Sequence, residues 1–536
     1  MRSDDSFTSK NKPVITPMPV VAIIGSRGPD EPRAPTAIPA RQDGAGSQNQ
    51  PSKRDPRAAS FPVTAEPTPG RLQAIQTGKE REMKTRYDVC VIGAGTAGFS
   101  ASETARAGGH SVLVVSGAGD LGGTCILRGC MPAKTLLTAT ARLGEVETAS
   151  AVGVDVPEAT IDLRRIVARK RELVDYFVKD RIHELETYPL LRGSARFVAR
   201  DAIVVEGQRI EADRFIVATG SSIVAPDIPG FRECGFFTSD AALEMTTAPT
   251  SLAIVGGGPV GCEFAQYFAR LGTRVTLLQV EPALLRKEDG DVGEAIARVL
   301  AADGVDVRIG TALLRARREG DRRLLLIRDV SGERELAVDQ VMLASNRRPN
   351  TANLELANAE IETNDADGIV VDGFLRTTNP NVFAAGDVLG RRCLVHVAEY
   401  AGKLAVSNAF AAAPTAVDFD RFEAHAVYTQ PQVAVAGLTE RLCAERGLAI
   451  TVRRHPFADV GKAIVEAAPE GFVKMIADGD GRIRGVAIVG ESAIDLIGEA
   501  IAFIDRGATT TEVATMPHLH PTMGEILGRV ADDFTD

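Results

Sequence analysis

The chain has 536 residues, which at about 100–200 residues per domain predicts three or four folding units. Its 61 basic and 71 acidic residues give a formal net charge of −10, which argues against nucleic acid or an anionic membrane surface as a partner. Seven cysteines in so long a chain exclude a disulfide-rich secreted scaffold and favour a reducing, cytoplasmic location, and because no run of 18 apolar residues occurs we expect no transmembrane helix.

Residues 1–84 are expected to form a disordered extension and not to be part of the fold. Twelve of the 28 prolines fall within residues 1–82, and this polar stretch offers too little apolar surface to offset the entropy lost on ordering. A targeting peptide is the alternative, but prolines interrupt its apolar run and acidic residues stand near its start. Met83 shortly precedes the first strand-like run, so the sequence also suggests a natural translation start there.

A first nucleotide-binding unit is predicted directly after this extension. The run YDVCVIG, which begins at Tyr87, is expected to be a buried parallel strand, and Gly93-x-Gly95-x-x-Gly98, a small-residue helix and the run SVLVVS follow it. In such a unit the first glycine permits a tight turn, the second lets a pyrophosphate approach the backbone, and the third lets the helix pack on the strand. The phosphates then lie at the positive end of the helix dipole.

The same layout returns in the middle of the chain. A strand at 251–255 leads into Gly256-x-Gly258-x-x-Gly261, a helix, and a second strand at 274–279. One such motif is a weak signal, because an ordinary glycine-rich turn gives the same pattern. Two units with matching spacing predict two dinucleotide-binding domains.

The residue that ends the second strand of each unit bears on which nucleotide is bound. An acidic residue there binds the adenosine ribose hydroxyls, but Ser116 ends the first unit and Gln279 ends the second. Ser116 can still make one hydrogen bond to a ribose. Since no arginine stands at 279–281 to meet a 2′-phosphate, we expect NAD to be preferred, with NADP remaining possible.

Between the two units, residues 121–134 read LGGTCILRGCMPAK and contain two cysteines five positions apart. If a helix begins just after Gly123, Cys125 and Cys130 lie within about a turn and a half, and the neighbouring glycines allow the bend that a local disulfide requires. A helix N-terminus lowers the pKa of a cysteine, and Lys134 adds positive charge. The alternatives are two buried structural thiols or half of a zinc site, but without a second cysteine or histidine pair nearby we expect no metal.

The run HLHPTMGE at 518–525 indicates a general base near the C-terminus. Pro521 can start a helix, which would bring Glu525 near His520 after the turn. A carboxylate that orients an imidazole creates a base that works near neutral pH. The remaining histidines of interest, His518, His396 and His425, are expected to be ordinary core or surface residues.

The segment GGTCILRGCMPAK closely resembles the redox-active disulfide segment of the FAD-dependent pyridine nucleotide–disulfide oxidoreductases, the family that contains dihydrolipoyl dehydrogenase, glutathione reductase and mercuric reductase. The resemblance runs from about residue 85 to the C-terminus. Further segments that carry it, in order, are IVATG (216–220), TNPNVFAAGDV (378–388), HVAEYAGKLAVSNAF (396–410), AVYTQPQVAVAGLTE (426–440) and the run that holds His520 and Glu525.

The resemblance implies two cofactors. FAD would bind the first unit, where Thr219 and Gly220 match the turn that returns the chain after that unit. Gly386 and Asp387 match the second FAD motif, in which the aspartate contacts the ribityl–phosphate region. NAD would bind the second unit.

The resemblance also implies the catalytic roles. Cys130 would be the thiolate against the flavin, and Cys125 would be the interchange thiol that reacts with the substrate's sulfur. His520, contributed by the other subunit of a homodimer, would move the proton, and Glu525 would hold it. A pair between Lys134 and Glu263 would sit near the flavin.

The expected fold class is α/β, with two Rossmann-like domains, for FAD and NAD(P), and a C-terminal α+β dimerisation domain. The FAD domain would be split between 85–248 and 371–420. The NAD(P) domain would lie between them at 249–370, and the dimerisation domain would span 421–536.

Within the family, the H-x-H-P-T-x-x-E ending and the expected preference for NAD favour a dihydrolipoyl dehydrogenase-like enzyme that acts on a dithiol or disulfide. A mercuric-reductase-like, glutathione-reductase-like or quinone-reducing paralogue is the alternative. The C-terminus ADDFTD lacks the second thiol pair expected of a mercury-specific enzyme, and departures such as Leu127 in place of the usual asparagine leave the physiological electron partner open. A non-catalytic dinucleotide-binding protein is disfavoured, because it has no chemical need for the cysteines, the histidine and the glutamate together.

Overall fold

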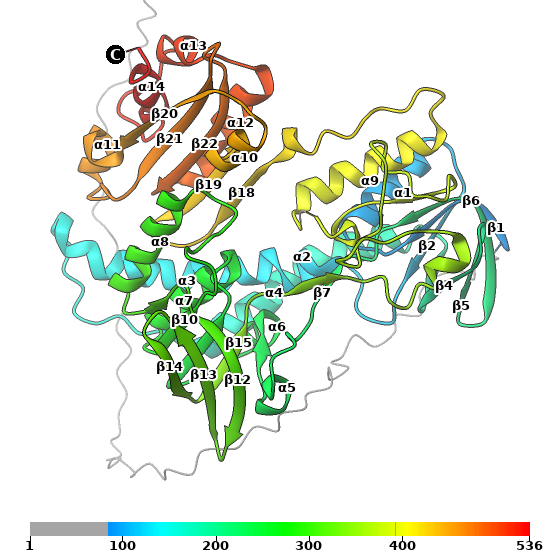
Figure 1. The fold of residues 1–536 in the computed structure, drawn as a ribbon, viewed down its shortest axis with the longest axis horizontal. Helices are drawn as coiled ribbons and strands as arrows, with labels where there is room; N and C mark the ends of the chain where they lie inside the picture. Colours follow the sequence, from blue (N-terminus) through cyan, green and yellow to red (C-terminus); the bar gives the residue numbers. More distant parts are fainter. Residues whose placement is uncertain (1–83, 392, 536) are drawn as a thin grey trace, which may run out of the picture. The chain divides into compact units, whose positions relative to one another are not determined.

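The computed structural model describes residues 84–391 and 393–535, so the expected extension at 1–84 lies, apart from its last residue, outside the described residues. In the described part the chain forms two largely parallel sheets, each covered by helices, and a C-terminal antiparallel sheet (Figure 1). The predicted α/β fold class is therefore confirmed.

The first parallel sheet is built around β1 (Arg86–Ile92), which has parallel neighbours on both sides. Its side chains are buried from Val89 onwards, which is why the run reads as continuously apolar. The strand order is β3-β2-β1-β6-β5-β4, with β17 beside β6. The bounds are β2 (Val112–Ser116), β3 (Leu190–Arg192), β4 (Ala195–Ala199), β5 (Ala202–Val205), β6 (Gln208–Val217) and β17 (Val382–Ala384).

Two helices far apart in the sequence pack tightly beside this sheet. Helix α1 (Thr96–Ala107) follows the first glycine motif, and α9 (Val395–Phe410) comes from the segment expected to complete the first domain. A Cβ added at Gly402 of α9 would lie 2.2 Å from the Ala97 carbonyl oxygen. The residues at 371–420 therefore contribute both a strand, β17, and a helix to the first sheet's unit.

The second parallel sheet has the order β11-β10-β9-β15-β8 and carries α7 (Pro259–Arg270) and α8 (Gly290–Ala302). Its strands are β8 (Phe237–Thr238), β9 (Ser251–Val255), β10 (Arg274–Leu278), β11 (Asp306–Arg308) and β15 (Gln340–Leu343). Smaller antiparallel sheets and short helices flank it: β12 (Ala312–Glu319) with β13 (Arg322–Asp329) and β14 (Gly332–Val338), β7 (Ser221–Ile223) with β16 (Arg347–Pro349), α5 (Phe231–Cys234) and α6 (Ser239–Ala242).

The C-terminal domain is a five-stranded antiparallel sheet, β18-β19-β22-β21-β20, with helices packed against it. Its central strands are buried on both faces, since helices cover one face and α7 and α8 approach the other. The bounds are β18 (Ala424–Val427), β19 (Gln432–Gly437), β20 (Ile450–Pro456), β21 (Phe472–Asp478), β22 (Ile483–Gly490), α10 (Glu440–Glu445), α11 (Gly461–Val465), α12 (Ala493–Arg506), α13 (Thr510–Ala514) and α14 (Glu525–Asp532).

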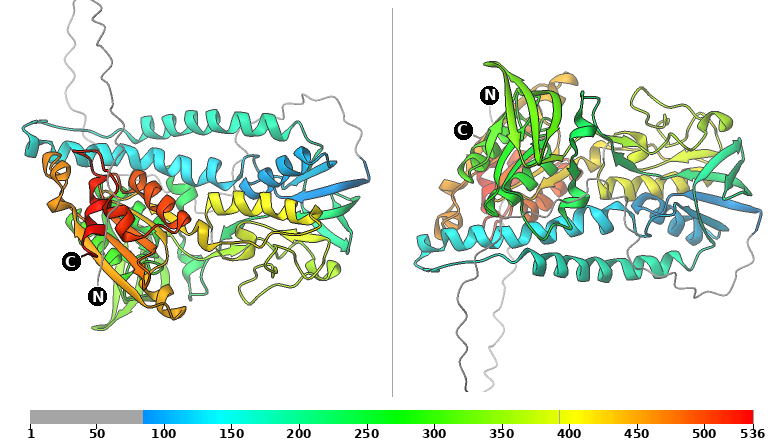
Figure 2. Two further views of the ribbon diagram at one scale, coloured as in Figure 1. Left: turned by 90° about the horizontal axis from the view of Figure 1, so that it is seen from above. Right: turned by 90° about the horizontal axis from the view of Figure 1, so that it is seen from below.

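Three α-helices lie between β2 and β3 of the first sheet. The short α2 (Gly123–Arg128) leads into α3 (Cys130–Thr148), which also packs against α7 of the second sheet's unit, and α4 (Leu163–Leu185) returns alongside α3 (Figure 2). The side chain of Asp162 caps α4 by accepting hydrogen bonds from the second and third backbone amides of the helix, those of Arg164 and Arg165. Within the described residues, no helix combines the length and the apolar character needed to cross a membrane.

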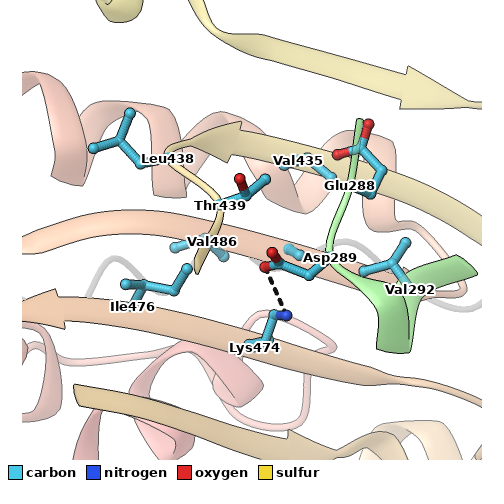
Figure 3. A pocket seen from close by; sticks show the side chains of 10 residues that line it. Glu288, Asp289, Val292, Val435, Leu438, Thr439, Lys474, Ile476 and Val486 are labelled. Carbon is cyan, nitrogen blue, oxygen red and sulfur yellow. Dashed lines mark ion pairs between the residues drawn. The ribbon is translucent and has the colours of Figure 1, made fainter. Parts of the chain in front are cut away.

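A buried lysine joins the C-terminal sheet to the start of α8 (Figure 3). Lys474 of β21 is 2% exposed, and its Nζ forms ion pairs with Asp289 at 2.7 Å, Asp291 at 2.8 Å and Glu440 at 2.9 Å. Three carboxylates thus compensate a cation removed from water. A cavity of about 10 Å³ beside this cluster is large enough for a single water molecule.

Candidate functional site

The first glycine-rich turn has the geometry that a bound pyrophosphate requires. Gly93 has a φ of +114°, and a Cβ there would lie 2.2 Å from the Ala218 carbonyl oxygen. A Cβ on Gly98 would lie 1.8 Å from the carbonyl oxygen of Gly93, so the helix can approach the strand only without a side chain. Gly95 instead has open space, its nearest neighbour being the Gly123 Cα at 4.0 Å. The turn is tight at its two ends and accessible in the middle.

The second turn has a similar positive φ at its first glycine and the same close approach at its third. Gly256 has a φ of +116°, and a Cβ on Gly261 would lie 1.8 Å from the Gly256 carbonyl oxygen. The middle residue, Gly258, has no atom within 4 Å of such a Cβ. Both turns therefore leave open space over the middle glycine at a helix N-terminus, where a dinucleotide's phosphates can approach the backbone.

A cavity of about 920 Å³ opens over the first turn. This volume lies at the upper end of the range of about 300–1,000 Å³ usual for ligand sites, so the cavity fits an elongated group such as FAD. The predicted contacts that line it are Gly93, Gly95, Ser116, Thr219 and Gly220.

Hydrogen bonds fix the far wall of this cavity. Asn350 binds Thr219 reciprocally, because its Nδ2 donates to the Thr219 carbonyl at 2.9 Å and its own carbonyl accepts from Thr219 Oγ1 at 2.9 Å. Ser221 Oγ donates to Asp387 Oδ2 at 2.8 Å and accepts from Arg347 Nε at 2.9 Å. The second FAD motif is thereby tied to residues that line the cavity.

The neighbouring glycine of that motif also lies against the first turn. A Cβ added at Gly386 would be 3.1 Å from the Cβ of Ala97 in α1. The predicted contacts Gly386 and Asp387 are thus brought next to the N-terminal turn of the helix that would bind the phosphates.

Gln279, expected to meet the ribose of the second nucleotide, lies buried at the end of β10. Its Oε1 accepts a hydrogen bond from the Gly257 N–H at 3.0 Å, and its Nε2 donates to the Ala283 carbonyl at 3.1 Å. The carboxamide therefore braces the second glycine-rich turn. The next residue, Val280, is exposed.

The two cysteines lie in consecutive helices, where the sequence predicted a single one. Cys125 is in α2 and Cys130 is the first residue of α3, with the break at Gly129. A Cβ at Gly129 would lie 2.9 Å from the Thr124 carbonyl oxygen and 3.2 Å from the Cys125 Cα, so the chain folds back on itself there. This fold-back brings the two thiols close enough for each to shift the pKa of the other.

The pKa values of the two thiols are shifted in opposite directions. The pKa of Cys130 is lowered to about 7, first because the Cys125 thiol donates a hydrogen bond to its sulfur, and also because Lys134 lies nearby. The pKa of Cys125 is raised, first by that same interaction with Cys130 and then by burial. Cys130, at the N-terminus of α3, is therefore the thiol of the pair that loses its proton first.

Lys134 of α3 forms the predicted pair with Glu263 of α7. Its Nζ lies 2.8 Å from each carboxylate oxygen, and Glu263 is 3% exposed. The ring of Tyr428 covers the same ammonium group at 4.3 Å, while the Tyr428 N–H donates to Glu263 Oε1 at 2.9 Å. The Lys134 ammonium is thus held by Glu263 from the second sheet's unit and by Tyr428 from the C-terminal domain. It lies on the same helix as Cys130, one turn further on.

The same face of α7 anchors the segment that carries Tyr428. Gln266, one turn after Glu263, accepts from the Gln430 N–H at 2.8 Å and donates to the Gln430 carbonyl at 2.8 Å. Arg270, a further turn on, donates to Gln430 Oε1 at 2.7 Å. This anchoring keeps the Tyr428 ring over Lys134.

His520 and Glu525 also form a pair, with His520 Nδ1 2.8 Å from Glu525 Oε1. The pKa of Glu525 is lowered, first by this hydrogen bond and then by the Thr522 N–H. The helix that Pro521 was expected to start begins only at Glu525, whose second oxygen accepts from Thr522 and closes the turn before it. The His520 side chain is 75% exposed, so its free nitrogen is available to a second molecule.

The structure thus assembles the predicted residues in four groups: the first turn with its cavity, the second turn, the dithiol with its ion pair, and the His520–Glu525 pair. Among residues 84–391 and 393–535, no hydrogen bond or ion pair joins the last group to the dithiol. Residue patterns did not single out Asn350, Ser221 or Tyr428, because each acts through a partner more than 100 residues away.

Two family models match the chain. The model for pyridine nucleotide-disulphide oxidoreductases matches residues 87–402, and the model for the dimerisation domain of the same family matches residues 424–531.

Named relatives span nearly the whole described chain. Mercuric reductase of Streptomyces lividans is 34% identical over 461 residues, covering 84% of this chain and 97% of that protein. Dihydrolipoyl dehydrogenase of Bacillus subtilis (strain 168) is 31% identical over 453 residues, covering 82% and 96%. Among solved structures, the HOCl-induced flavoprotein disulfide reductase RclA from Escherichia coli matches with a TM-score of 0.74 and 28% identity, covering 83% of this chain and 99% of that one.

Proposed function

We propose a reaction for this chain, which belongs to the pyridine nucleotide–disulphide oxidoreductase family. The chain moves two electrons between NAD(H) and a dithiol or disulfide substrate through Cys125 and Cys130. Enzymes of this family are FAD-dependent and use NAD(P)H as the electron donor. The observation that carries the proposal is the fold-back at Gly129, which places Cys130 at the N-terminus of α3 beside Cys125 and goes with a lowered pKa of the Cys130 thiol.

Residues of both turns would hold the cofactors. FAD would lie in the cavity over Gly95, within reach of Ser116 and Thr219, and NAD(H) would lie over Gly258. Bound FAD would supply the two-electron chemistry that connects a nicotinamide with a pair of sulfurs.

The chain's own residues supply the thiol chemistry. In the reducing direction, the Cys125 sulfur attacks the substrate disulfide, so that a bond between Cys125 and the substrate forms and the substrate's S–S bond breaks. The Cys125 proton passes to the His520 imidazole as the sulfur attacks, and the leaving thiolate takes that proton from the resulting imidazolium. The Cys130 thiolate then attacks the Cys125 sulfur, closes the internal disulfide and releases the second substrate sulfur as a thiolate. The substrate gains two electrons, and the dithiol loses two.

An anaerobic titration with NADH tests this function. Reduction should produce a long-wavelength thiolate–flavin absorption band, and Cys130→Ser should abolish the band while leaving the flavin reducible. A flavin that is reduced without the band in the wild-type protein, together with unchanged turnover in Cys130→Ser, would refute the thiol mechanism.

A homodimer fits the dimerisation domain and the exposed His520. We propose that each imidazole serves the other subunit's dithiol. Mixing Cys125→Ala subunits with His520→Gln subunits tests this, because a hybrid dimer then regains one complete site and a random mixture recovers about one quarter of wild-type activity. If His520 served its own subunit, no activity would return.

The substrate is proposed to be a lipoamide-like dithiol or disulfide. Mercuric ion is a second candidate, because a mercuric reductase is among the relatives that align over almost their full length. The substrate is identified by measuring NADH consumption with one electron acceptor at a time, at equal NADH concentration. The acceptors are lipoamide, glutathione disulfide, a quinone and mercuric ion. NADH consumption that is fastest with mercuric ion and absent with lipoamide would reject the dihydrolipoyl dehydrogenase-like activity.

A further inference from the structure

One partly buried cation has no part in the site described above. Arg181 lies on α4, and its Nη1 is buried without a hydrogen-bond partner. In the described residues no carboxylate forms an ion pair with it, and the guanidinium instead lies 3.5 Å from the centre of the Phe99 ring. Because burying a cationic N–H without a hydrogen-bond partner is costly, the Nη1 of Arg181 is a group for which a further partner is expected.

Helix packing places Arg181 near the interchange thiol. A Cβ at Gly122 would lie 2.8 Å from Val178 Cγ2, so α4 presses on the start of α2. Arg181 is one turn beyond Val178, on the same face of α4, and Cys125 is three residues beyond Gly122.

Helix α1 also contacts the start of α2, the helix that carries Cys125. A Cβ at Gly123 would lie 2.7 Å from the Gly95 Cα, so the start of α2 touches the first glycine-rich turn. Phe99, which supports the guanidinium, is one turn beyond Gly95 in α1. Helices α1 and α4 therefore both touch the start of α2, and Arg181 of α4 reaches across to Phe99 of α1.

The electrostatics agree with this placement. Cys130 and burial raise the pKa of Cys125, whereas Arg181 lowers it. Burial lowers the pKa of Arg181 itself, while Glu103, Glu184 and Glu399 act in the opposite direction. A guanidinium keeps its charge under such conditions, so a fixed positive charge acts on the thiol that must become the nucleophile.

We propose, on the basis of the function proposed above, that Arg181 is a positioning residue for Cys125, whose unpartnered guanidinium stabilises the negative sulfur that attacks the substrate disulfide. In that step the sulfur begins as an anion and ends in a neutral disulfide bond, and the charge passes to the leaving sulfur. Arg181 thus increases the fraction of Cys125 that is ready to react at neutral pH.

Alkylation of Cys125 by iodoacetamide, followed by peptide mass spectrometry from low to high pH, tests the proposal. The Cys130→Ser background isolates Cys125, and iodoacetamide is uncharged, so Arg181 cannot steer it. If Arg181→Met raises the thiol's pKa by about one unit, the thiolate fraction at neutral pH falls about tenfold while each thiolate becomes about threefold more nucleophilic. The variant should therefore react about threefold more slowly below both pKa values and about threefold faster above them.

The crossing of the two pH profiles is the diagnostic result, because a structural role slows the reaction at every pH. Lys179→Met is the matched control, since it removes a positive charge from an exposed position of the same helix, and its profile should coincide with that of the background. Arg181→Lys should restore the original profile. If Arg181→Met does not retain bound flavin, Arg181→Gln replaces it.

Coincident profiles for the Arg181 and Lys179 variants would overturn the proposal, as would slowing at all pH values in every Arg181 variant, lysine included. The measurement requires no turnover of a disulfide. A failure of the proposed function and a failure of this inference therefore give different results.

Discussion

The largest cause of the acidity of Cys130 is a single neighbour, and removing that neighbour tests the site quantitatively. The hydrogen bond from the Cys125 thiol holds the pKa of Cys130 at about 7. In Cys125→Ala this bond is lost and the pKa should rise towards the ordinary cysteine value of about 8.5. A change of 1.5 units corresponds to about 2 kcal/mol. At pH 7 the thiolate fraction should then fall from about one half to about 3%, roughly 16-fold.

The assay is a pH titration of the thiolate–flavin band, which in this variant needs no prior reduction because Cys130 has no partner. A thiolate is present above its pKa and lost as the pH falls through it, so the midpoint should move upward from about 7. Cys125→Ser, whose hydroxyl can still donate a hydrogen bond, should lie between the two. A midpoint that stays near 7 in Cys125→Ala would refute the reasoning and assign the acidity to Lys134 and the helix N-terminus.

The two turns should be separable by mutation: Gly98→Ala should give protein without bound flavin, whereas Gly261→Ala should keep the flavin and raise the KM for NADH, as absorbance and steady-state kinetics would show. Loss of flavin in both variants would contradict the assignment of one nucleotide to each turn. Glu263→Gln should lower the free energy of unfolding in urea by about 1–3 kcal/mol, because a buried charged hydrogen bond is weakened; it should also move the thiolate midpoint to lower pH, since Glu263 raises the pKa of Cys130. An upward shift of that midpoint would be the contrary result. Gln279→Leu should raise the KM for NADH without changing flavin content, because the Gly257 N–H loses its acceptor; an unchanged KM would show that the brace is dispensable.

Features that depend on local chain geometry were predictable from the sequence. Both glycine motifs fix their own backbone conformation, since Gly98 and Gly261 pack on carbonyl oxygens only five residues earlier. The strands beside them follow from continuous apolar runs. The cysteine segment was predicted less fully, because the break at Gly129 depends on contact with the preceding helix and not on the residue pattern.

Contacts between distant segments were beyond pattern reasoning. The Lys134–Glu263 pair was expected only through the family resemblance, although the partners are 129 residues apart. Tyr428 and Arg181 carried no local signal, because one acts by covering an ammonium group from another domain and the other by being buried without a partner. Such residues become visible only when burial and charge are considered in three dimensions.

The claim that electrons pass through the dithiol is tested most directly by counting thiols. The purified protein is treated anaerobically with one equivalent of NADH, alkylated, and mapped by mass spectrometry against an untreated sample. The account predicts that two thiols appear, that both map to Cys125 and Cys130, and that the other five cysteines are unchanged. Oxidation of NADH with no new thiol at either position would contradict it.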